Sequence, residues 1–527
     1  METSHQPRTL ADIPALHAAR TPDGIALQFE DRVTTWADWE HQSGEMARAL
    51  TAAGLCAGDR VGYLGKNSDH FFRVFFGAMQ AGMVTVPVNW RLSPPEIAFI
   101  LDDAECPILF VGADYAGLAE DLRRRCPRLR EVICVDGPAP GTTPLPQWLE
   151  RHPGGKSAHT AHPADVALQL YTSGTTGHPK GAQLTHANLL FAASLSQSEL
   201  LGRWRADDVS VLPLPLFHAG GLVYGLNGPY AGCTTIIVRE ANPALVLDAC
   251  RRAPAPVTRL GLVPAVLQML LNTPGFGASE LPALRTLTYG GSPIPPTALR
   301  QAIALFDRPV LLQLFGMTET CTIGTALLPA DHDPDGHPQR LTSCGRALPG
   351  VEVRVARPDG APAPTHESGE IWIRCPAVMS GYWHREEDTA AALRDGWYRT
   401  GDVGYLDAEG YLFIQDRLKD MIVSGGENVY PAEVERVLAE HPSVADVAVF
   451  GIPDARWGET VKAAAVLRTG HTASADDLIA FARERIAAYK CPKSIDFMEA
   501  LPRNATGKLL KRVLREPYWA GHTRQVS

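Results

Sequence analysis

The chain has 527 residues, and at roughly 150 residues per domain this length predicts several structural units rather than one compact core. Hydrophobic residues make up 45% and charged residues 20%, which is ordinary globular usage and excludes a disordered, collagen-like or fibrous chain. The formal net charge of -9 argues against a nucleic-acid partner, because affinity for a phosphate backbone needs a basic surface. A local basic pocket for one nucleotide is still compatible with this charge.

The ten cysteines are scattered, and none forms the CxxC pair that is typical of metal or redox sites. Such cysteines indicate small buried hydrophobes in a reducing compartment. The N-terminal sequence METSHQPRTLADIPALHAAR has no apolar core and no cleavage pattern of a signal peptide. The most apolar stretch, residues 209–238, contains several prolines and glycines and is predicted to be buried loop and strand rather than a membrane span. We therefore expect a soluble, cytoplasmic protein with no transmembrane segment.

Short apolar runs alternate with amphipathic segments along the first part of the chain, which is the pattern of an α/β fold. In chain order the sequence predicts a helix over 36–53, a strand over 61–64, a helix over 71–81, a strand over 84–88, a helix over 94–104 and a strand over 106–111. The region 112–163 has a weaker pattern, and its Pro- and Gly-rich segments predict surface loops.

The pattern changes near residue 416. Before it, the segments GEIWIRCPAVMSGYW and DGWYRTGDVGYLDAEGYLFI predict turn-rich β structure. After it, the sequence predicts a helix over 431–442, strands over 444–453 and 461–470, a helix over 473–489 and a strand over 494–502. Ser474 with Asp477 is a typical helix start. These changes predict two domains, residues 1–416 and residues 417–527.

The strongest chemical signal is the segment Tyr171-Thr-Ser-Gly-Thr-Thr-Gly-His-Pro-Lys-Gly181, which follows the apolar run 166–170. A strand followed by a loop of glycines and hydroxyl residues offers many N–H and O–H donors to an anion. Lys180 adds a point charge for phosphate oxygens. The spacing is not that of a Walker A loop. By itself the loop predicts a phosphate site, with a merely polar surface loop as the alternative.

Four further segments carry polar groups suited to a nucleotide. In QLFGMTET, Phe315 is an aromatic that can stack on a base, and Thr318 and Glu319 are oxygen ligands suited to Mg²⁺. In YRTGD, the carboxylate of Asp402 can accept hydrogen bonds from ribose hydroxyls. The segment DRLKDMIVSGGENV begins at residue 416, and the basic segment PRNATGK ends at Lys508. Taken singly, each has an ordinary explanation as a surface acid, a turn residue or a solvated lysine.

Together and in this order, these motifs resemble the adenylate-forming (AMP-binding) superfamily, of the acyl-CoA synthetase or CoA ligase type, over about residues 10–512. The resemblance implies an α/β fold with a large N-terminal domain of fused α/β and β subdomains and a small, mobile α/β C-terminal domain. It implies an AMP-forming acid–thiol ligase that uses ATP, Mg²⁺ and coenzyme A. It also implies that the C-terminal domain rotates about a hinge at Lys419.

The resemblance further assigns individual residues of this sequence. The residues implied to bind ATP are Thr172, Ser173, Gly174, Thr175, Thr176, Gly177, Lys180, Gly291, Ser292, Phe315, Asp402 and Arg417. Those implied to hold the metal are Thr318 and Glu319, and Lys508 is the implied catalytic lysine. Gly425, Gly426 and Trp457 are implied to lie beside coenzyme A. The acid pocket is implied to contain His218, Ala219, Gly220, Gly290, Gly316, Met317 and Cys321. Phe315 departs from the family pattern, in which a tyrosine is usual.

Amino-acid-activating members of the family place an aspartate in the acid pocket, whereas the matching segment here, PLFHAGG, has no acid. A buried ammonium without a partner is costly, so an α-amino acid is disfavoured. Small, uncharged pocket residues favour an apolar fatty, aryl or bulky polycyclic acid. Coenzyme A is the expected acceptor, an acyl carrier protein is the alternative, and a non-catalytic nucleotide-binding protein is the rival from another class. The oligomeric state stays open, with a homodimer among the options.

Overall fold

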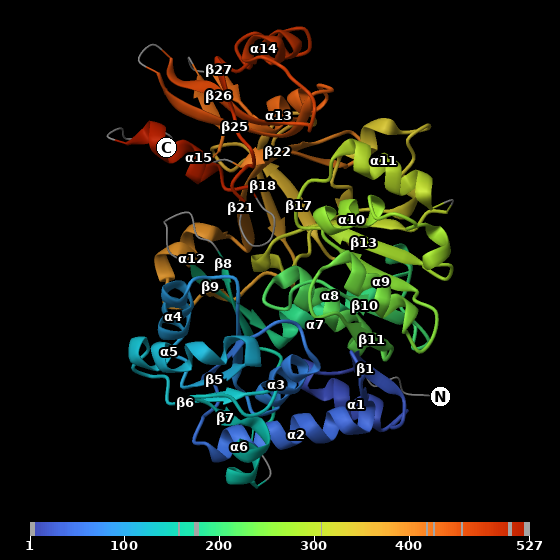
Figure 1. Cartoon of the computed structure of the whole chain (residues 1–527), viewed down its shortest axis with the longest axis vertical. Helices are drawn as coiled ribbons and strands as arrows, with labels where there is room; N and C mark the ends of the chain where they lie inside the picture. Colours follow the sequence, from blue (N-terminus) through green and yellow to red (C-terminus); the bar gives the residue numbers. More distant parts are fainter. Residues whose placement is uncertain are drawn as a thin grey trace. The chain divides into compact units, whose positions relative to one another are not determined.

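A computed structural model describes residues 6–155, 159–172, 179–306, 308–417, 420–424, 427–454, 457–503 and 509–520, with the backbone alone at residues 416, 417, 427 and 428 (Figure 1). The chain forms two compact units: Met1–Val353 with Ile373–Tyr398, and Arg354–Trp372 with Arg399–Ser527. Each unit combines sheets with helices, as predicted for an α/β fold. The domain boundary at residue 416 and the hinge at Lys419 stay predictions.

The first unit contains an eight-stranded sheet that carries the predicted phosphate loop. Its strands are β3 (Arg60–Leu64), β4 (Val84–Val88), β5 (Ile108–Val111), β6 (Glu131–Cys134), β7 (Thr143–Pro144), β8 (Val166–Thr172), β9 (Lys180–Thr185) and β19 (Gly381–Tyr382). Their order is β19-β9-β8-β4-β3-β5-β6-β7. The strands from β8 to β7 run parallel, whereas β9 and β19 are antiparallel to their neighbours. Every residue of β4 is buried, as expected for a parallel strand that is covered on both faces.

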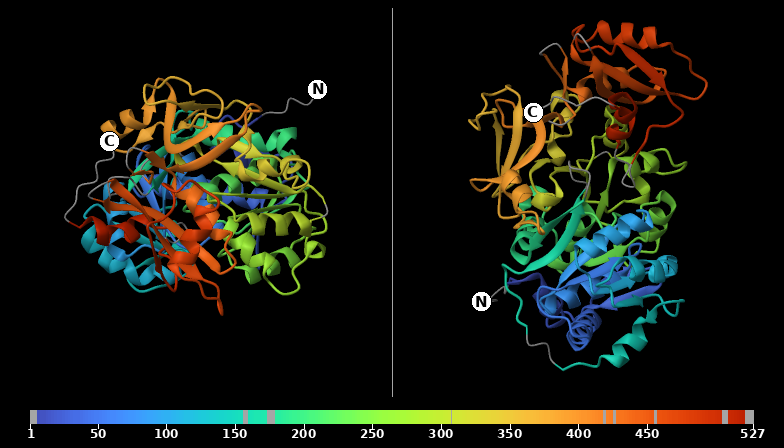
Figure 2. Two further views of the ribbon diagram at one scale, coloured as in Figure 1. Left: turned by 90° about the horizontal axis from the view of Figure 1, so that it is seen from above. Right: turned by 90° about the vertical axis from the view of Figure 1, so that its left-hand side faces the viewer.

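Helices cover this sheet with their apolar faces. They include α3 (Asp69–Gln80), α4 (Pro94–Asp103), α5 (Ala119–Arg125) and α6 (Leu145–Arg151). Helices α4 and α5 lie side by side in Figures 1 and 2, and their buried residues join those of β5 and β6 in one apolar cluster. Ser93 and Glu96 form a capping box at the start of α4, where the prolines need no hydrogen-bond donor.

A nine-stranded sheet forms the rest of the first unit's core. Its strands are β1 (Ile25–Phe29), β2 (Arg32–Thr35), β10 (Val209–Leu212), β11 (Thr234–Ile237), β12 (Arg259–Leu262), β13 (Thr286–Gly290), β14 (Leu311–Phe315), β15 (Thr325–Leu327) and β16 (Arg346–Ala347). Its order is β16-β15-β14-β13-β12-β10-β11-β1-β2. The remaining helices of this unit are α1 (Ile13–Ala18), α2 (Trp36–Ala52), α7 (His186–Ser194), α8 (Ala219–Ala231), α9 (Pro243–Arg251), α10 (Pro264–Leu271), α11 (Pro296–Leu305) and α12 (Glu386–Ala392).

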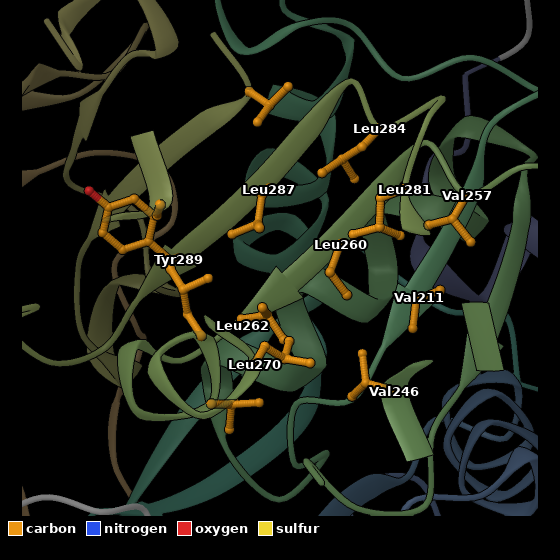
Figure 3. Close-up of a cluster of buried hydrophobic side chains, with 14 of the residues drawn as sticks. Val211, Val246, Val257, Leu260, Leu262, Leu270, Leu281, Leu284, Leu287 and Tyr289 are labelled. Carbon is orange, nitrogen blue, oxygen red and sulfur yellow. The ribbon is translucent and has the colours of Figure 1, made fainter. Parts of the chain in front are cut away.

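Figure 3 shows the apolar cluster between this sheet and its helices. Leu260, Leu262 and Leu287 project from β12 and β13 and meet Val246 of α9 and Leu270 of α10, and all of them are almost fully buried. Burying apolar area is the main stabilising contribution to such a core. This packing fixes the carboxyl ends of β13 and β14, where several of the predicted site residues follow.

The chain crosses between the two units within β17 (Glu352–Ala356), β18 (Gly369–Arg374) and β21 (Trp397–Leu406). Nearby strands are β20 (Leu393–Arg394) and β22 (Leu412–Arg417). The second unit has its own sheet of β23 (Ile422–Ser424), β24 (Glu427–Val429), β25 (Val444–Asp454), β26 (Gly458–Leu467) and β27 (Ser494–Phe497). Its helices are α13 (Pro431–Ala439), α14 (Ala475–Arg483) and α15 (Lys511–Trp519).

Side chains of β25 alternate between two apolar clusters of the second unit. Val447 and Val449 pack with α13 and α14, whereas Ala448 and Phe450 pack with α15. Figure 1 accordingly shows α14 and α15 on opposite sides of these strands. The period of two in a strand explains this division, because successive side chains point to opposite faces.

Several elements differ from the sequence prediction. Residues 209–238, predicted as loop and strand, include the 13-residue helix α8 with Pro229 inside it. The region 112–163 contains α5, β6 and α6 in addition to loops. Helix α14 ends at Arg483, earlier than predicted, although its predicted capping box of Ser474 and Asp477 is present. Among the residues that the structure describes, no helix is long and apolar enough to cross a membrane.

Candidate functional site

The predicted phosphate loop connects two antiparallel strands. Thr172 at the end of β8 pairs with Lys180 at the start of β9, so the two residues that flank the loop are backbone neighbours. Ser173, Gly174, Thr175, Thr176 and Gly177 lie outside the described residues. The loop leaves the carboxyl end of β8, which runs parallel to β4. That edge is where open α/β sheets bind ligands.

Glu319 lies in the short 3-10 helix η6 (Thr318–Thr320), just after β14, and it is buried. Its Oε1 atom accepts a hydrogen bond from the Tyr382 hydroxyl at 2.8 Å and a long one from the Thr172 hydroxyl at 3.5 Å. Its other carboxylate oxygen accepts no hydrogen bond from any residue in the described part of the chain. One oxygen is therefore held by the protein while the second is left for another partner.

The carboxylate of Glu319 and the hydroxyl of Thr318, a half-buried residue, fit Mg²⁺ chemically. Mg²⁺ prefers oxygen ligands and commonly uses one or two carboxylates, completing its shell with water and substrate phosphate. The described residues contain no group of three or more His, Cys, Asp or Glu side chains that could enclose a metal by themselves. The site therefore suits a metal that arrives with a phosphate rather than one held by the protein alone.

The backbone around Glu319 turns sharply. Cys321 and Thr322, which follow η6, have left-handed φ values of 49° and 63°. A Cβ atom on Gly316 would lie 2.2 Å from the carbonyl carbon of Thr322, so only glycine permits this close return of the chain. Consecutive left-handed residues other than glycine are strained, and strain of this kind is common at functional sites. Burial also raises the pKa of the Cys321 thiol, which makes it a packing residue rather than a nucleophile.

Lys180 is held by a residue that the sequence analysis did not identify. Its ammonium lies 2.5 Å from Oδ1 of Asp388 in α12, and the lysine side chain is 12% exposed. The ammonium is also 5.5 Å from the ring centroid of Tyr382. Tyr382 and Asp388 thus contact the two predicted phosphate-site charges, Lys180 and Glu319. The GYW and EED triplets of residues 381–388 were the available signals in the sequence.

A polar cluster anchors the segment that contains Tyr382. Asp103, at the end of α4, accepts hydrogen bonds from the Tyr171 hydroxyl at 2.6 Å and from Arg385 at 2.7 Å. The Trp383 indole donates to the backbone carbonyl of Asp103 at 3.0 Å. The guanidinium of Arg60 stacks over the Trp383 ring at 3.3 Å from its centroid. This cluster ties the segment to β3, β8 and α4 of the same unit.

The residues predicted to contact the adenine base and the carboxylic acid lie at the carboxyl ends of β13 and β14. Gly290 pairs with Leu314, and a Cβ on Gly290 would lie 2.3 Å from the Leu314 carbonyl oxygen. Gly291 has a φ of 83°, and Ser292 after it is exposed. Phe315 is half-buried at the end of β14. The structure therefore brings Gly290, Gly291 and Phe315 together, while their contacts with a nucleotide stay a prediction.

His218 stands directly before α8. Its Nε2 atom is buried, and no residue of the described chain forms a hydrogen bond with it. Burial, and secondarily the charge of Arg91, lower its pKa from 6.5 to about 4, so the ring is neutral near pH 7. Ala219 is buried, whereas Gly220 is exposed and a Cβ there would meet nothing within 4 Å. Met317 is half-buried. The acid-pocket role of these residues stays a prediction.

In the second unit, Asp402 of β21 pairs with Arg417 of β22 across the antiparallel ladder. Asp402 is buried, and its backbone amide donates to the Thr400 hydroxyl at 3.0 Å. Trp457 is 43% exposed. Lys419, Gly425, Gly426 and Lys508 lie outside the described residues. The two residues implied to hold the ribose are thus neighbours in the backbone, as a shared role requires.

The α/β body and the buried Glu319 beside Thr172 agree with the predicted adenylate-forming enzyme. A family model described as AMP-binding enzyme matches residues 15–383, and a model of the AMP-binding enzyme C-terminal domain matches residues 433–508. The chain therefore belongs to the AMP-binding enzyme family.

Known proteins are similar to this chain over almost its whole length. A fatty acid–[acyl-carrier-protein] ligase, ScoC of Streptomyces coeruleorubidus, is 38% identical over 532 residues, which covers 100% of both chains. A feruloyl-CoA synthase of an Amycolatopsis species is 38% identical and covers 97% of this chain and 99% of its own. The solved structure of o-succinylbenzoate CoA synthetase from Bacillus subtilis, bound to its acyl-adenylate intermediate, has a TM-score of 0.83 and 33% identity, covering 95% of this chain and 97% of its own.

These comparisons confirm the predicted superfamily and the predicted fold class. They also confirm the enzyme class, an AMP-forming acid–thiol ligase, and with it the expected use of a carboxylic acid, ATP, Mg²⁺ and coenzyme A. They do not assign roles to single residues of this chain.

Proposed function

We propose that this enzyme activates an apolar fatty, aryl or bulky polycyclic acid and transfers the acyl group to coenzyme A. The observation that carries the proposal is the uncharged character of the predicted acid pocket. The segment Pro215–Gly221 contains no acid, and His218 is neutral near pH 7 because burial lowers its pKa to about 4. An α-ammonium would have no counter-charge among these residues.

A free carboxylate is a poor acyl donor because it lacks a good leaving group, so it has to be activated before the acyl group can be transferred. In the first step, a carboxylate oxygen of the acid attacks the α-phosphorus of ATP, the bond to the bridging oxygen breaks, and pyrophosphate leaves. In the second step, the thiolate of coenzyme A attacks the acyl carbon, and AMP leaves with the bonding electrons. Negative charge accumulates as two anions meet in the first step, so nearby cationic groups should act by electrostatic stabilisation.

Each charged residue of the proposed site has a distinct task. Lys180 would bind phosphate oxygens beside the loop, and Lys508 would reach the α-phosphate and the attacking carboxylate. Glu319 and Thr318 would hold Mg²⁺, which supplies neutralisation of the phosphate charge when it is bound. Asp402 and Arg417 would bind the ribose. Water has to be excluded from the acyl-adenylate, because hydrolysis would waste it.

The two steps need different groups beside the same carbonyl carbon. We propose that the C-terminal domain, residues 417–527, turns about Lys419 to meet this need. In one orientation it would present Lys508, and in the other it would present Gly425, Gly426 and Trp457 to the pantetheine arm. Such alternation is a hinge-type change. The proposal also includes a cytoplasmic location, which cell fractionation tests. It includes a homodimer, which a measurement of the molecular mass in solution tests.

An acyl carrier protein is the second candidate acceptor. The specific observation in its favour is the match to an acyl-carrier-protein ligase over 100% of both chains, at the same 38% identity as the feruloyl-CoA synthase. Coenzyme A and a carrier protein present the same pantetheine arm, so the core of the site serves either. We favour coenzyme A because a feruloyl-CoA synthase, a long-chain-fatty-acid–CoA ligase and an indoleacetate–CoA ligase are similar to this chain at 36–38% identity.

A panel of ATP–pyrophosphate exchange assays tests the acid, and an acceptor assay tests the thiol. The panel contains fatty, aryl and polycyclic acids together with acetate and α-amino acids. Exchange that is fastest with an apolar acid supports the proposal, and exchange that is fastest with acetate or an amino acid contradicts it. Preferred acid, ATP and Mg²⁺ are then mixed with coenzyme A or with a pantetheinylated carrier protein. Faster thioester formation on the carrier would establish the second candidate instead.

A further inference from the structure

One short segment contacts both Glu319 and Lys180, two charged residues of the predicted ATP site. Tyr382 donates from its hydroxyl to Glu319 at 2.8 Å, and Asp388 forms an ion pair with Lys180 at 2.5 Å. Both residues belong to the segment Gly381–Thr389, which runs from β19 into the first turn of α12. The contacts join residues far apart in the chain, with separations of 63 and 208 positions.

This segment is also anchored by contacts other than those with Glu319 and Lys180. Tyr382 pairs with Ala182 of β9, and the Trp383 amide donates to the Gly181 carbonyl at 2.8 Å. The Thr389 hydroxyl accepts from the Tyr382 amide at 2.9 Å, which ties the strand to α12. Arg385 adds its ion pair with Asp103 at 2.7 Å. A support anchored in this way can fix the groups that it contacts.

We propose that Tyr382 and Asp388 are positioning residues of the ATP site: Tyr382 orients Glu319 for the metal, and Asp388 holds Lys180 until a phosphate of ATP replaces it. The proposal rests on the proposed function, because it takes Glu319 and Lys180 as groups that meet Mg²⁺ and ATP. Neither positioning residue is assumed to touch the reacting atoms.

The case for Tyr382 rests on the asymmetry of the Glu319 carboxylate. Its Oε1 atom is occupied by the Tyr382 and Thr172 hydroxyls, whereas Oε2 accepts no hydrogen bond from the described residues. A side chain with one oxygen fixed can rotate little, so the second oxygen keeps a defined direction. Outer contacts of this kind commonly tune a metal ligand, and their removal costs about 10–100-fold in metal affinity.

The case for Asp388 rests on competition for one ammonium. The Lys180 side chain is 12% exposed and its ammonium faces the Asp388 carboxylate, so a phosphate must take the place of that carboxylate. Before ATP binds, the pair keeps a poorly solvated cation neutralised and in one position. When ATP binds, the bond to Asp388 is exchanged for bonds to phosphate oxygens. Removing the carboxylate charge should therefore strengthen ATP binding.

Tyr382→Phe deletes the hydroxyl that contacts Glu319 and keeps the ring. Calorimetric titration gives the dissociation constant of ATP in EDTA and in Mg²⁺, without any acid, so that no reaction occurs. We expect the gain in ATP affinity produced by Mg²⁺ to fall about tenfold, since a hydrogen bond to a charged group is lost. The affinity in EDTA should stay within about twofold. Tyr63→Phe, which deletes a buried hydroxyl 3.0 Å from Ser68, is the matched control and should leave both constants unchanged.

Asp388→Asn removes the competing charge, and Glu387→Gln is the matched control because it removes the same charge from an exposed neighbour. We expect Asp388→Asn to tighten ATP binding in EDTA about five- to tenfold at low salt, with a smaller gain at high salt. Glu387→Gln should change it by less than about twofold. Weaker or unchanged ATP binding in Asp388→Asn overturns the proposed exchange.

Wild-type exchange assays separate this inference from the proposed function. If the wild-type enzyme exchanges pyrophosphate with an apolar acid while Tyr382→Phe keeps the full Mg²⁺ gain, the positioning role of Tyr382 is wrong. If the wild type shows no acid-dependent exchange, the proposed function fails, and the ATP titrations still decide on the two residues. Circular dichroism checks that the variants fold. Should Tyr382→Phe not fold, Asp388→Asn decides, because its side chain is 30% exposed and tolerates the change.

Discussion

Asp402 and Arg417 are direct partners across the antiparallel strands β21 and β22. The resemblance to adenylate-forming enzymes assigns both to the ribose of ATP, and this pairing brings two separate motifs of the sequence, YRTGD and DRLKD, to adjacent positions. Because Asp402 is also buried, its carboxylate has a fixed setting in which to accept hydrogen bonds.

Asp402→Asn should raise the KM for ATP about tenfold, because an amide is a poorer acceptor than a carboxylate for two ribose hydroxyls. The informative comparison uses 2′,3′-dideoxy-ATP, which lacks these hydroxyls. The variant and the wild type should differ by less than about twofold with this analogue, since the interaction is already absent. An equal penalty with ATP and with the dideoxy analogue would show that Asp402 acts elsewhere.

Lys508→Ala should affect the two half-reactions differently. If Lys508 reaches the α-phosphate during adenylation, ATP–pyrophosphate exchange should fall by about 100-fold or more, since an electrostatic contact to the developing charge is lost. Thioester formation from supplied acyl-adenylate and coenzyme A should largely survive. Lys511→Ala is the control, because its ammonium pairs with Glu435 at 2.9 Å and has no proposed role in catalysis. Equal loss of both half-reactions in Lys508→Ala would refute the assigned role.

Replacing each of two glycines predicted for the acid pocket by alanine should have a different effect, on stability in one case and on acid preference in the other. Gly316→Ala places a Cβ 2.2 Å from the Thr322 backbone, so we expect the free energy of unfolding to fall by about 1–3 kcal/mol. Gly220→Ala meets nothing within 4 Å, so the stability should hold while the preferred acid becomes smaller. Urea denaturation measures the first effect and the exchange panel the second. A stable Gly316→Ala variant, or an unchanged acid preference in Gly220→Ala, would contradict these assignments.

The buried histidine His186 should make the protein less stable in mild acid. His186 accepts a hydrogen bond at Nδ1 from the Leu10 amide at 3.2 Å, which requires that nitrogen to be unprotonated. Burial lowers its pKa from 6.5 to about 4. Between these two values the unfolded chain binds the proton more readily, so stability falls as the pH falls from 6.5 towards 4. The full effect is roughly 3 kcal/mol.

Urea denaturation of the wild type and of His186→Asn at several pH values checks this prediction. The variant should be less stable near pH 7, where its lost packing dominates, and its stability should change less between pH 6.5 and 4.5. His471→Asn, which replaces an exposed histidine of the second unit, should keep the wild-type slope. A slope in His186→Asn as steep as that of the wild type would contradict the assignment.

Strands and amphipathic helices could be predicted from the sequence where one face is apolar. The pattern of residues 36–53 gives α2, which ends at Ala52 before the left-handed Gly54. Helix α8 could not be predicted, because its sequence AGGLVYGLNGPYA is poor in helix-forming residues. Most of its residues are buried, so tertiary packing rather than local propensity stabilises it.

In the site, too, residues that stand in local sequence motifs could be predicted, whereas residues that act through long-range contacts could not. Thr172, Lys180, Glu319 and Asp402 stand in motifs whose order along the chain indicates the family. Tyr382 and Asp388 act through contacts that span 63 and 208 positions, and no local pattern encodes such pairings. The register of β19 against β9 brings the segment of Tyr382 next to β9, which begins at Lys180.

The product balance of the complete reaction tests the central claim most directly. Purified enzyme is incubated with ATP, Mg²⁺, coenzyme A and the acid that gives the fastest exchange, and the products are quantified by liquid chromatography with mass spectrometry. We predict equal amounts of AMP, pyrophosphate and the acyl-CoA thioester, with none formed when the acid is omitted. Formation of ADP and phosphate, or of AMP without any thioester, would contradict an AMP-forming acyl-CoA ligase.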